Sequence, residues 1–293
     1  MAFLSRKNRL LVVKILGLLS IIRWPNVLFT ALAQYVSAVY IFTPNRSHWD
    51  VIKDPELHFI VAATAFIVAA GFIINSFYDL EKDLINRPHR TLFDRVVSKE
   101  FCLRMYFIFN AVGLAFSLLA SWRVLIFFAA FIFWLWLYSH KLQKIPVIRE
   151  FTASILSVIS VFSIALYYQH VSWMIVLFAA TVISVLFNRE LIKDLKNLDG
   201  DLAVGNQSIT TKWGARTSKN IFGLVSIVIV AITLSFYHYS TANYKMGYVL
   251  FVSFSSLLAW GILTTTKGKK SLFWAHRIYK IMLAGGILYL VIM

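Results

Sequence analysis

The chain of 293 residues contains one cysteine, five prolines and only thirteen acidic residues. With Cys102 alone, an internal disulfide is excluded and a cysteine-based metal site is not expected. Charged residues make up 14% of the chain, about half of what soluble domains carry, whereas hydrophobic residues make up 59%. The mean hydropathy of +0.73 excludes an ordinary soluble globular domain. We therefore interpret the chain as an integral membrane protein.

The scarcity of acids leaves a formal net charge of +16. Such an excess can indicate a nucleic-acid partner, but the sequence has no RNP-type motif, zinc-finger spacing or helix-turn-helix pattern. In a membrane protein, basic residues gather in cytoplasmic loops and meet anionic lipid. We expect membrane lipid as a partner and no nucleic acid.

Apolar runs near the roughly 20 residues needed to cross a bilayer recur nine times. The sequence predicts an all-α polytopic membrane protein with nine transmembrane helices, in a single domain over residues 1–293. Residues 1–21 mix basic and apolar side chains, which is typical of an amphipathic helix on the inner leaflet. Only short polar breaks separate the third run from the fourth and the fifth from the sixth, so each pair can also be counted as one segment. The runs are expected at about 22–42, 59–78, 102–120, 122–139, 148–168, 171–190, 219–239, 246–264 and 273–292.

Loop charge predicts the orientation of these helices. With the N-terminus inside, the outer loops hold four basic residues and the other 25 of the 29 fall on the inner side. This asymmetry is what the positive-inside rule requires. It predicts a cytoplasmic N-terminus, a C-terminus outside, and cytoplasmic cap loops at 79–101 and 191–218. In a prokaryote, such a protein belongs in the inner or plasma membrane.

Two acidic ladders follow the second and sixth runs. Asn75, Asp79 and Asp83 are spaced i, i+4 and i+8, which keeps them within about 40° of one helical stripe. Asp194, Asn197 and Asp201 are spaced i, i+3 and i+7, again on one face. The loop charges put both ladders on the cytoplasmic side.

Carboxylates at the end of a membrane helix are costly unless a cation lies against them. A divalent metal is one such cation, because oxygen ligands suit Mg²⁺, which often shares its shell with substrate phosphates. The alternative is a solvated helix end whose acids pair with Lys82, Arg87 and Arg90.

The segment after the fourth run adds Tyr138 and Lys141 to the same predicted cap. Carboxylates, cations and a tyrosine would then lie above a helix-long apolar interior. A lipid with two or more phosphates on a hydrocarbon tail is the ligand that such a site describes.

These segments resemble the motifs of the UbiA superfamily of intramembrane prenyltransferases. The family's first motif, Asn-Asp-x-x-Asp-x-x-x-Asp followed by Asn-x-Pro-x-Arg, is matched by Asn75, Asp79 and Asp83 and then by 86–90. The second, Asp-x-x-Asp-x-x-Gly-Asp, is matched over 194–201. Tyr-Ser-x-Lys at 138–141, Arg-x-Pro-Asn at 23–26 and the helix count also fit. Four motifs in the right order cover nearly the whole chain.

The chain departs from these motifs at two positions. Ser76 stands where the family has its first aspartate, and Asn197 stands where the second motif has a middle aspartate. Each replacement removes a negative charge and keeps an oxygen that can coordinate a metal. We expect weaker Mg²⁺ binding but not inactivation, because the other four aspartates remain.

The resemblance implies Mg²⁺-dependent transfer of a prenyl group from a polyprenyl diphosphate to a lipophilic acceptor. Catalysis is assigned to Asp79, Asp83, Asp194 and Asp201, and metal binding to these four with Asn75 and Asn197. Arg90, Lys141, Lys193 and Arg23 are candidate diphosphate partners, whereas Asn26 and Tyr138 are candidates for orienting the acceptor. Each of these cations is otherwise a cytoplasmic residue that meets lipid headgroups.

The form of the first motif resembles the digeranylgeranylglyceryl phosphate synthase and chlorophyll synthase branch of the family. A basic cap suits a phosphoglycerol acceptor such as geranylgeranylglyceryl phosphate. Aromatic quinone precursors, among them 4-hydroxybenzoate, dihydroxynaphthoate and homogentisate, remain open. So do two functions of other classes: a membrane transporter, and a non-catalytic binder of prenyl phosphates.

Overall fold

The computed structural model describes residues 6–43, 45–79, 98–169, 171–203, 205–239, 245–266 and 268–292. Every regular element in these ranges is a helix, so the predicted all-α class is confirmed. Eight helices of the described chain are long and apolar enough to cross a membrane. The ninth predicted span is also helical, as α13 (Lys269–Ile292), but it is not among these eight.

The chain divides into two compact units. The first comprises residues 1–35 and 52–140, and the second comprises residues 36–51 and 141–293. A short helix, α3 (His48–Ile52), lies where the chain passes from the second unit back to the first.

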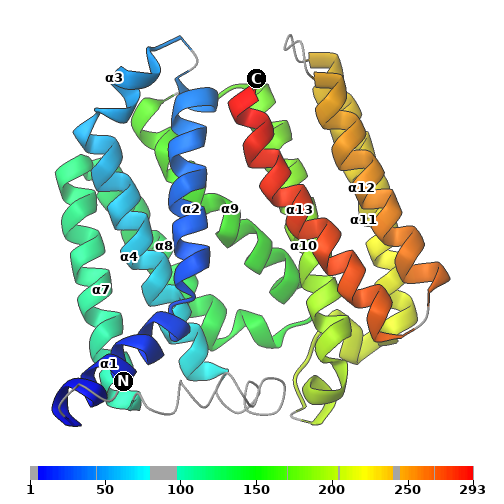
Figure 1. The fold of residues 1–293 in the computed structure, drawn as a ribbon, viewed down its shortest axis with the longest axis horizontal. Coiled ribbons are helices and arrows are strands. Elements are labelled where there is room, and N and C mark those ends of the chain that lie inside the picture. Colours follow the sequence, from blue (N-terminus) through cyan, green and yellow to red (C-terminus); the bar gives the residue numbers. More distant parts are fainter. Residues whose placement is uncertain are drawn as a thin grey trace. The chain divides into compact units, whose positions relative to one another are not determined.

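The first unit is organised around α4 (Pro55–Tyr78), which packs against α7 (Lys99–Ala120) and α8 (Trp122–His140) (Figure 1). The Asp54 side chain caps α4 by accepting from the backbone N–H of Glu56 at 3.1 Å, and Pro55 occupies the first turn, where no N–H is needed. Gly113 lets α7 approach α4 closely, since a Cβ there would lie 2.5 Å from Ile67 Cγ1. The remaining helices of this unit are α1 (Arg6–Ile21) and α2 (Trp24–Ser37).

The predicted short breaks between adjacent helices are present. Ser121 is extended and ends α7 directly before α8 begins at Trp122. Gln169 has a left-handed conformation, with φ of 53°, and ends α9 (Ile148–Tyr168). Both predicted helix pairs are therefore separate helices.

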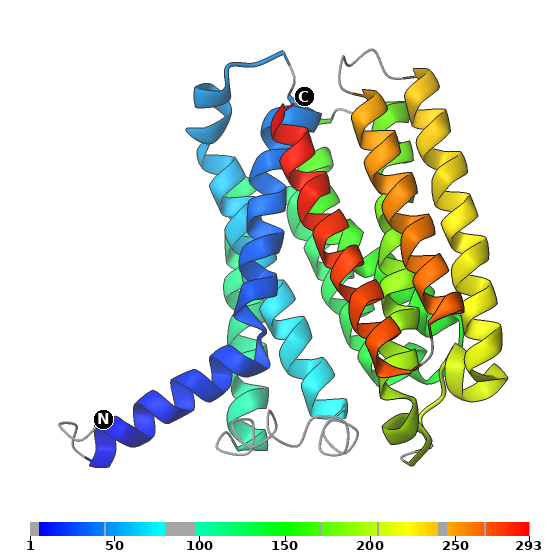
Figure 2. The ribbon, with the colours of Figure 1, turned by 45° about the vertical axis from the view of Figure 1, so that its right-hand side comes forward.

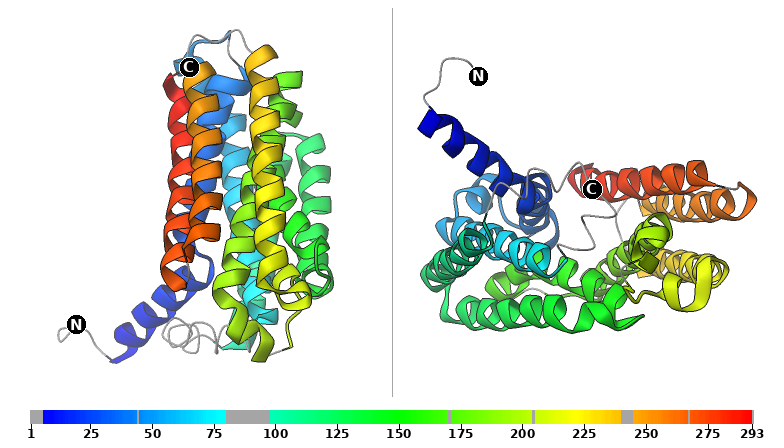
Figure 3. Two further views of the ribbon diagram at one scale, coloured as in Figure 1. Left: turned by 90° about the vertical axis from the view of Figure 1, so that its right-hand side faces the viewer. Right: turned by 90° about the horizontal axis from the view of Figure 1, so that it is seen from below.

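In the second unit, α10 (Trp173–Ala203) contacts α9, α11 (Ile209–Tyr239) and α13. Helix α11 packs against α12 (Lys245–Thr265), and α12 packs against α13. Figure 2 shows these three helices in yellow, orange and red, and Figure 3 shows them from below. Two short elements complete this unit, the π-helix η1 (Ala38–Phe42), which continues α2, and the 3-10 turn η2 (Leu142–Lys144).

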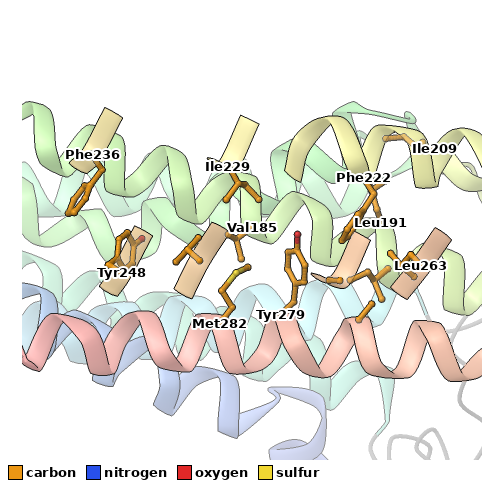
Figure 4. Packing of buried hydrophobic residues seen from close by; sticks show 14 of the residues in the cluster. Val185, Leu191, Ile209, Phe222, Ile229, Phe236, Tyr248, Leu263, Tyr279 and Met282 are labelled. Atoms are coloured by element: carbon orange, nitrogen blue, oxygen red, sulfur yellow. The ribbon is translucent and has the colours of Figure 1, made fainter. Parts of the chain in front are cut away.

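The core of this unit is apolar but contains a buried polar network around Tyr279. Figure 4 shows Tyr279 of α13 pointing into the cluster of buried side chains, near Phe222 and Val185. Its hydroxyl accepts a hydrogen bond from Asn188 Nδ2 at 2.9 Å and lies 3.0 Å from Ser256 Oγ. The network therefore joins α10, α12 and α13. Between membrane helices, such hydrogen bonds add specificity because the hydrophobic effect does not drive helix association in lipid.

The segment 191–218 differs from the expected loop. Helix α10 continues through Ala203 and α11 begins at Ile209, so most of this segment is helical. The segment stays helical because its buried residues, Leu191, Asp194 and Asp201, recur at helical spacing along one side of α10. Gly214, with φ of 84° and ψ of 164°, kinks α11 before its apolar part begins.

Candidate functional site

The first acidic ladder begins at the C-terminal end of α4. Asn75 Nδ2 donates a hydrogen bond to Asp79 Oδ2 at 2.8 Å, and the backbone N–H of Asp79 donates to the carbonyl of Asn75 at 2.9 Å. These contacts confirm that the i, i+4 spacing places both side chains on one stripe. Asp83 and Arg90 lie outside the described residues.

The second ladder lies on the last three turns of α10. Asp194 and Asp201 are completely buried, at 1% and 0% exposure, and Asn197 is half-buried. Burial of two carboxylates requires compensation by charge or by hydrogen bonds. Asp194 obtains this compensation from Arg149 of α9, whose Nη2 donates to Oδ1 at 2.5 Å.

The other oxygen of Asp194 is different. Its Oδ2 is buried and has no hydrogen-bond partner among the described residues. A carboxylate held through one oxygen and open at the other is oriented but still able to accept a ligand. This arrangement suits a metal-binding carboxylate, because the partner that orients it leaves one oxygen for the metal.

The neighbour of Arg149, Glu150, is buried and holds the surrounding backbone. Its Oε2 accepts from the N–H of Val147 at 2.8 Å, and its Oε1 accepts from the N–H of Ile209 at 3.0 Å. Arg149 also donates to the carbonyl of Gln207, at 3.4 Å. The start of α9 is thereby tied both to Asp194 and to the start of α11.

Sequence reasoning missed Arg149 and Glu150, although a signal was present. The two residues form an opposite-charge pair at the beginning of the fifth apolar run, 148–168, where charged side chains are costly. Such a pair at the start of a membrane helix indicates that each residue has a partner elsewhere in the fold.

The remaining predicted site residues occupy varied environments. Lys193 Nζ pairs with Glu190 Oε2 at 2.5 Å on α10. Arg23, between α1 and α2, lies over the ring of Phe72 on α4, at 5.3 Å from its centroid. Tyr138 on α8 is half-buried, whereas Lys141 and Asn26 are exposed.

The donor chemistry fits magnesium. The described residues contain no group of three or more histidine, cysteine, aspartate or glutamate side chains that could hold a metal ion. They do contain carboxylate and amide oxygens in pairs, which is how Mg²⁺ is bound when phosphate oxygens and water complete its six ligands. The open Oδ2 of Asp194 belongs to this oxygen-only set.

The fold and the site define a class, a multi-pass integral membrane protein with buried carboxylates on its membrane helices. The model of the UbiA prenyltransferase family matches residues 27–281, which includes both ladders and most of each unit. The chain therefore belongs to the UbiA prenyltransferase family.

Relatives and solved structures agree with this membership. The digeranylgeranylglyceryl phosphate synthase of Methanocaldococcus jannaschii is 26% identical over 210 residues, 71% of each chain. That of Thermococcus sibiricus is 26% identical over 243 residues, 83% of each. A solved digeranylgeranylglyceryl phosphate synthase structure has a TM-score of 0.71 at 19% identity, covering 96% of this chain and 99% of that one. A UbiA homologue from Archaeoglobus fulgidus bound to GPP and Mg²⁺ has a TM-score of 0.69 at 14% identity, covering 94% and 100%.

Proposed function

We propose that this protein transfers a geranylgeranyl-like group from a polyprenyl diphosphate to geranylgeranylglyceryl phosphate, with Mg²⁺ as cofactor and release of diphosphate. The observation that carries this proposal is the buried Asp194, oriented by Arg149 at 2.5 Å and open at Oδ2, in a chain of the UbiA family. The acceptor is supported by the curated digeranylgeranylglyceryl phosphate synthases to which the chain is similar.

The two ladders would hold the metal ions. Asn75, Asp79 and Asp83 are assigned to one Mg²⁺, and Asp194 and Asp201, with Asn197, to a second. Bound there, Mg²⁺ stabilises the charge that develops on the leaving diphosphate. The A. fulgidus homologue of similar fold, which was solved bound to GPP and Mg²⁺, supports a Mg²⁺-dependent site for a prenyl diphosphate in this chain.

Basic side chains would bind the diphosphate directly. Arg90, Lys141, Lys193 and Arg23 are assigned to this role because guanidinium and ammonium groups donate charge-assisted hydrogen bonds to phosphate oxygens. Glu190 already holds Lys193 within reach of the ladder face of α10. Asn26 and Tyr138 are assigned to orienting the acceptor.

Arg149 and Glu150 have a supporting role in this proposal. Arg149 fixes the rotamer of Asp194, and Glu150 fixes the backbone that carries Arg149. Outer partners of this kind set the orientation of a metal ligand and its affinity.

We further propose that α13 is the ninth transmembrane helix, that α1 lies on the inner leaflet, and that residues 1–293 work as one membrane domain. The loop charges support a cytoplasmic N-terminus, an outer C-terminus and an active site on the cytoplasmic side. Cysteine substitutions at exposed loop positions, labelled with a membrane-impermeant thiol reagent, test this topology. Labelling of an N-terminal position from outside would contradict it.

The function is tested with purified protein, labelled geranylgeranyl diphosphate and a panel of acceptors, with products identified by mass spectrometry. We expect a labelled glyceryl diether that disappears when EDTA removes Mg²⁺. Asp194→Asn should lower turnover at least about a hundredfold, as expected for loss of a main electrostatic group. The exposed Asp199 lies on the same helix, and Asp199→Asn is the matched control that should stay near wild type.

Three outcomes would contradict parts of this proposal. Labelled prenylated 4-hydroxybenzoate or another aromatic would overturn the acceptor. Turnover that survives EDTA would overturn the metal dependence. Binding of the donor without release of diphosphate, with any acceptor, would indicate a non-catalytic binder.

A further inference from the structure

Helix α10 carries a basic stripe beside the acidic ladder. At about 100° per residue, Arg189, Lys193 and Lys196 lie within about 60° of one another. Asp194 points about 140° away from Arg189 on the same scale, toward α9 and Arg149. The basic stripe therefore faces a direction different from that of Asp194. Pairing with this carboxylate does not account for its positive charge.

Helix α13 packs against α10 and runs antiparallel to it (Figure 1). The hydrogen bond from Asn188 to Tyr279, at 2.9 Å, fixes the register of the two helices. It places Arg189 beside the turn of α13 that contains His276 and Lys280. Lys193 and Lys196 continue the stripe of Arg189 along α10, so basic side chains of two packed helices meet along this contact.

Two nitrogen atoms in this group are buried without a partner. Neither Arg189 Nε nor His276 Nδ1 has a hydrogen-bond partner among the described residues. A buried polar nitrogen almost always has a hydrogen-bond partner in proteins, so these two atoms mark a place where a bound anion could supply one. Glu190 pairs with Lys193 at 2.5 Å, so this one carboxylate cannot neutralise Arg189, Lys196 and Lys280 as well.

We propose that Arg189, Lys196, His276 and Lys280 form a binding site for the phosphate monoester of a lipid, and that this lipid is the acceptor. The site itself follows from the geometry, whereas the identity of its occupant rests on the proposed function. A phosphate monoester offers three acceptor oxygens, enough to meet the two open nitrogens and the flexible lysines. Lys193, at the edge nearest the ladder, remains a diphosphate partner.

This arrangement lets one helix organise two anionic substrates. The ladder face of α10 would hold the metal-bound diphosphate of the donor, and the basic face would hold the acceptor phosphate. Separate sites keep two groups of like charge from repelling each other while both substrates are bound. The phosphate monoester thereby becomes the feature that distinguishes the acceptor from an uncharged lipid alcohol.

The test is a binding measurement without donor or metal ion. Native mass spectrometry in a neutral detergent compares geranylgeranylglyceryl phosphate with geranylgeranylglycerol, which lacks the phosphate. We expect the wild type to bind the phosphate form at least about tenfold more tightly, since one hydrogen bond to a charged group is worth about that factor. Arg189→Gln and His276→Gln should remove most of this preference.

Matched variants separate the role of individual atoms from folding. Arg189→Lys keeps the charge but removes Nε, so this variant should lose part of the preference. His276→Asn keeps a polar nitrogen near Nδ1, so it should retain most of the preference.

Lys280 is exposed, so Lys280→Gln can be tested without disturbing the core. Arg277→Gln is the control, because Arg277 is exposed and lies over the Phe273 ring at 4.3 Å. It should bind like the wild type.

The outcomes are distinguishable. Equal binding of the two lipids by the wild type, or an undiminished preference in Arg189→Lys, Arg189→Gln and Lys280→Gln, would overturn the site. Displacement of the probe by an equal concentration of phosphatidylglycerol would overturn the acceptor and indicate a headgroup site. If the wild type prefers the phosphate form yet releases no diphosphate with Mg²⁺ and donor, the proposed function fails and the phosphate site stands.

Discussion

Arg149 of α9 donates to Oδ1 of Asp194 on α10 at 2.5 Å, while the other carboxylate oxygen is buried without a hydrogen-bond partner among the described residues. A buried arginine and a buried aspartate are each unfavourable in a membrane protein, but as a pair they compensate one another. The pair also sets a direction, because it fixes which oxygen of Asp194 remains open. This contact, the two acidic ladders and the buried network around Tyr279 lead to four predictions.

Arg149→Gln should weaken metal binding by about 10- to 100-fold, the usual effect of removing an outer partner of a metal ligand. The reason is that Asp194 loses the contact that fixes its rotamer. Titration of purified protein with Mn²⁺, followed by electron paramagnetic resonance, measures this without turnover. Arg216→Gln, an exposed position on α11, is the control and should bind as the wild type does. Tighter binding in Arg149→Gln would show that the arginine competes with the metal instead of orienting its ligand.

Glu150→Gln should lower stability by about 1–3 kcal/mol, because the amide can replace only one of the two carboxylate acceptors. The backbone N–H of either Val147 or Ile209 would then be buried without its present acceptor. Unfolding in mixed micelles with increasing sodium dodecyl sulfate measures the change. Glu100→Gln serves as the reference, since Glu100 is exposed in the first turn of α7. An unchanged unfolding midpoint for Glu150→Gln would mean that these contacts contribute nothing.

Ser76→Asp and Asn197→Asp should lower the Mg²⁺ concentration needed for half-maximal activity, each several-fold. Both changes restore a carboxylate at a motif position, and a negatively charged oxygen binds a hard divalent cation more strongly than a hydroxyl or an amide. Steady-state rates over a range of Mg²⁺ concentrations, at saturating donor, test this. Asp199→Asn again provides the control for a change of one charge on α10. A higher Mg²⁺ requirement in both variants would contradict the assignment of these positions to the metal sites.

Tyr279→Phe should destabilise the second unit by about 0.6–1.7 kcal/mol, from the average to the largest value measured for hydrogen bonds between membrane helices. The hydroxyl that accepts from Asn188 and lies beside Ser256 is lost, while the ring keeps its place in the core. The micelle unfolding assay described for Glu150→Gln measures it. Tyr239→Phe, at the exposed end of α11, should change nothing. A loss of metal binding in Tyr279→Phe without a loss of stability would assign the network to the site instead of to the fold.

Much of the fold could be predicted from the sequence. Apolar runs of bilayer length locate the helices because lipid offers no partner for exposed backbone groups, so each span must satisfy its own N–H and C=O groups. The spacing of Asn75 and Asp79 likewise predicted a shared stripe, which their 2.8 Å contact confirms. The polarity of 191–203 predicts a loop, but the structure continues α10 through these residues because their 3.6-residue pattern continues beyond the apolar run.

Contacts between distant segments could not be predicted in this way. The separation of Arg149 from Asp194 is 45 residues, and that of Asn188 from Tyr279 is 91. Local spacing determines which face of its own helix a side chain occupies, but not which helix lies opposite. The sequence by itself therefore determined the helices, the acidic stripes and the family motifs. Only the tertiary structure decided which basic residue neutralises Asp194 and which of its oxygens stays open, because that depends on how α9 and α10 pack.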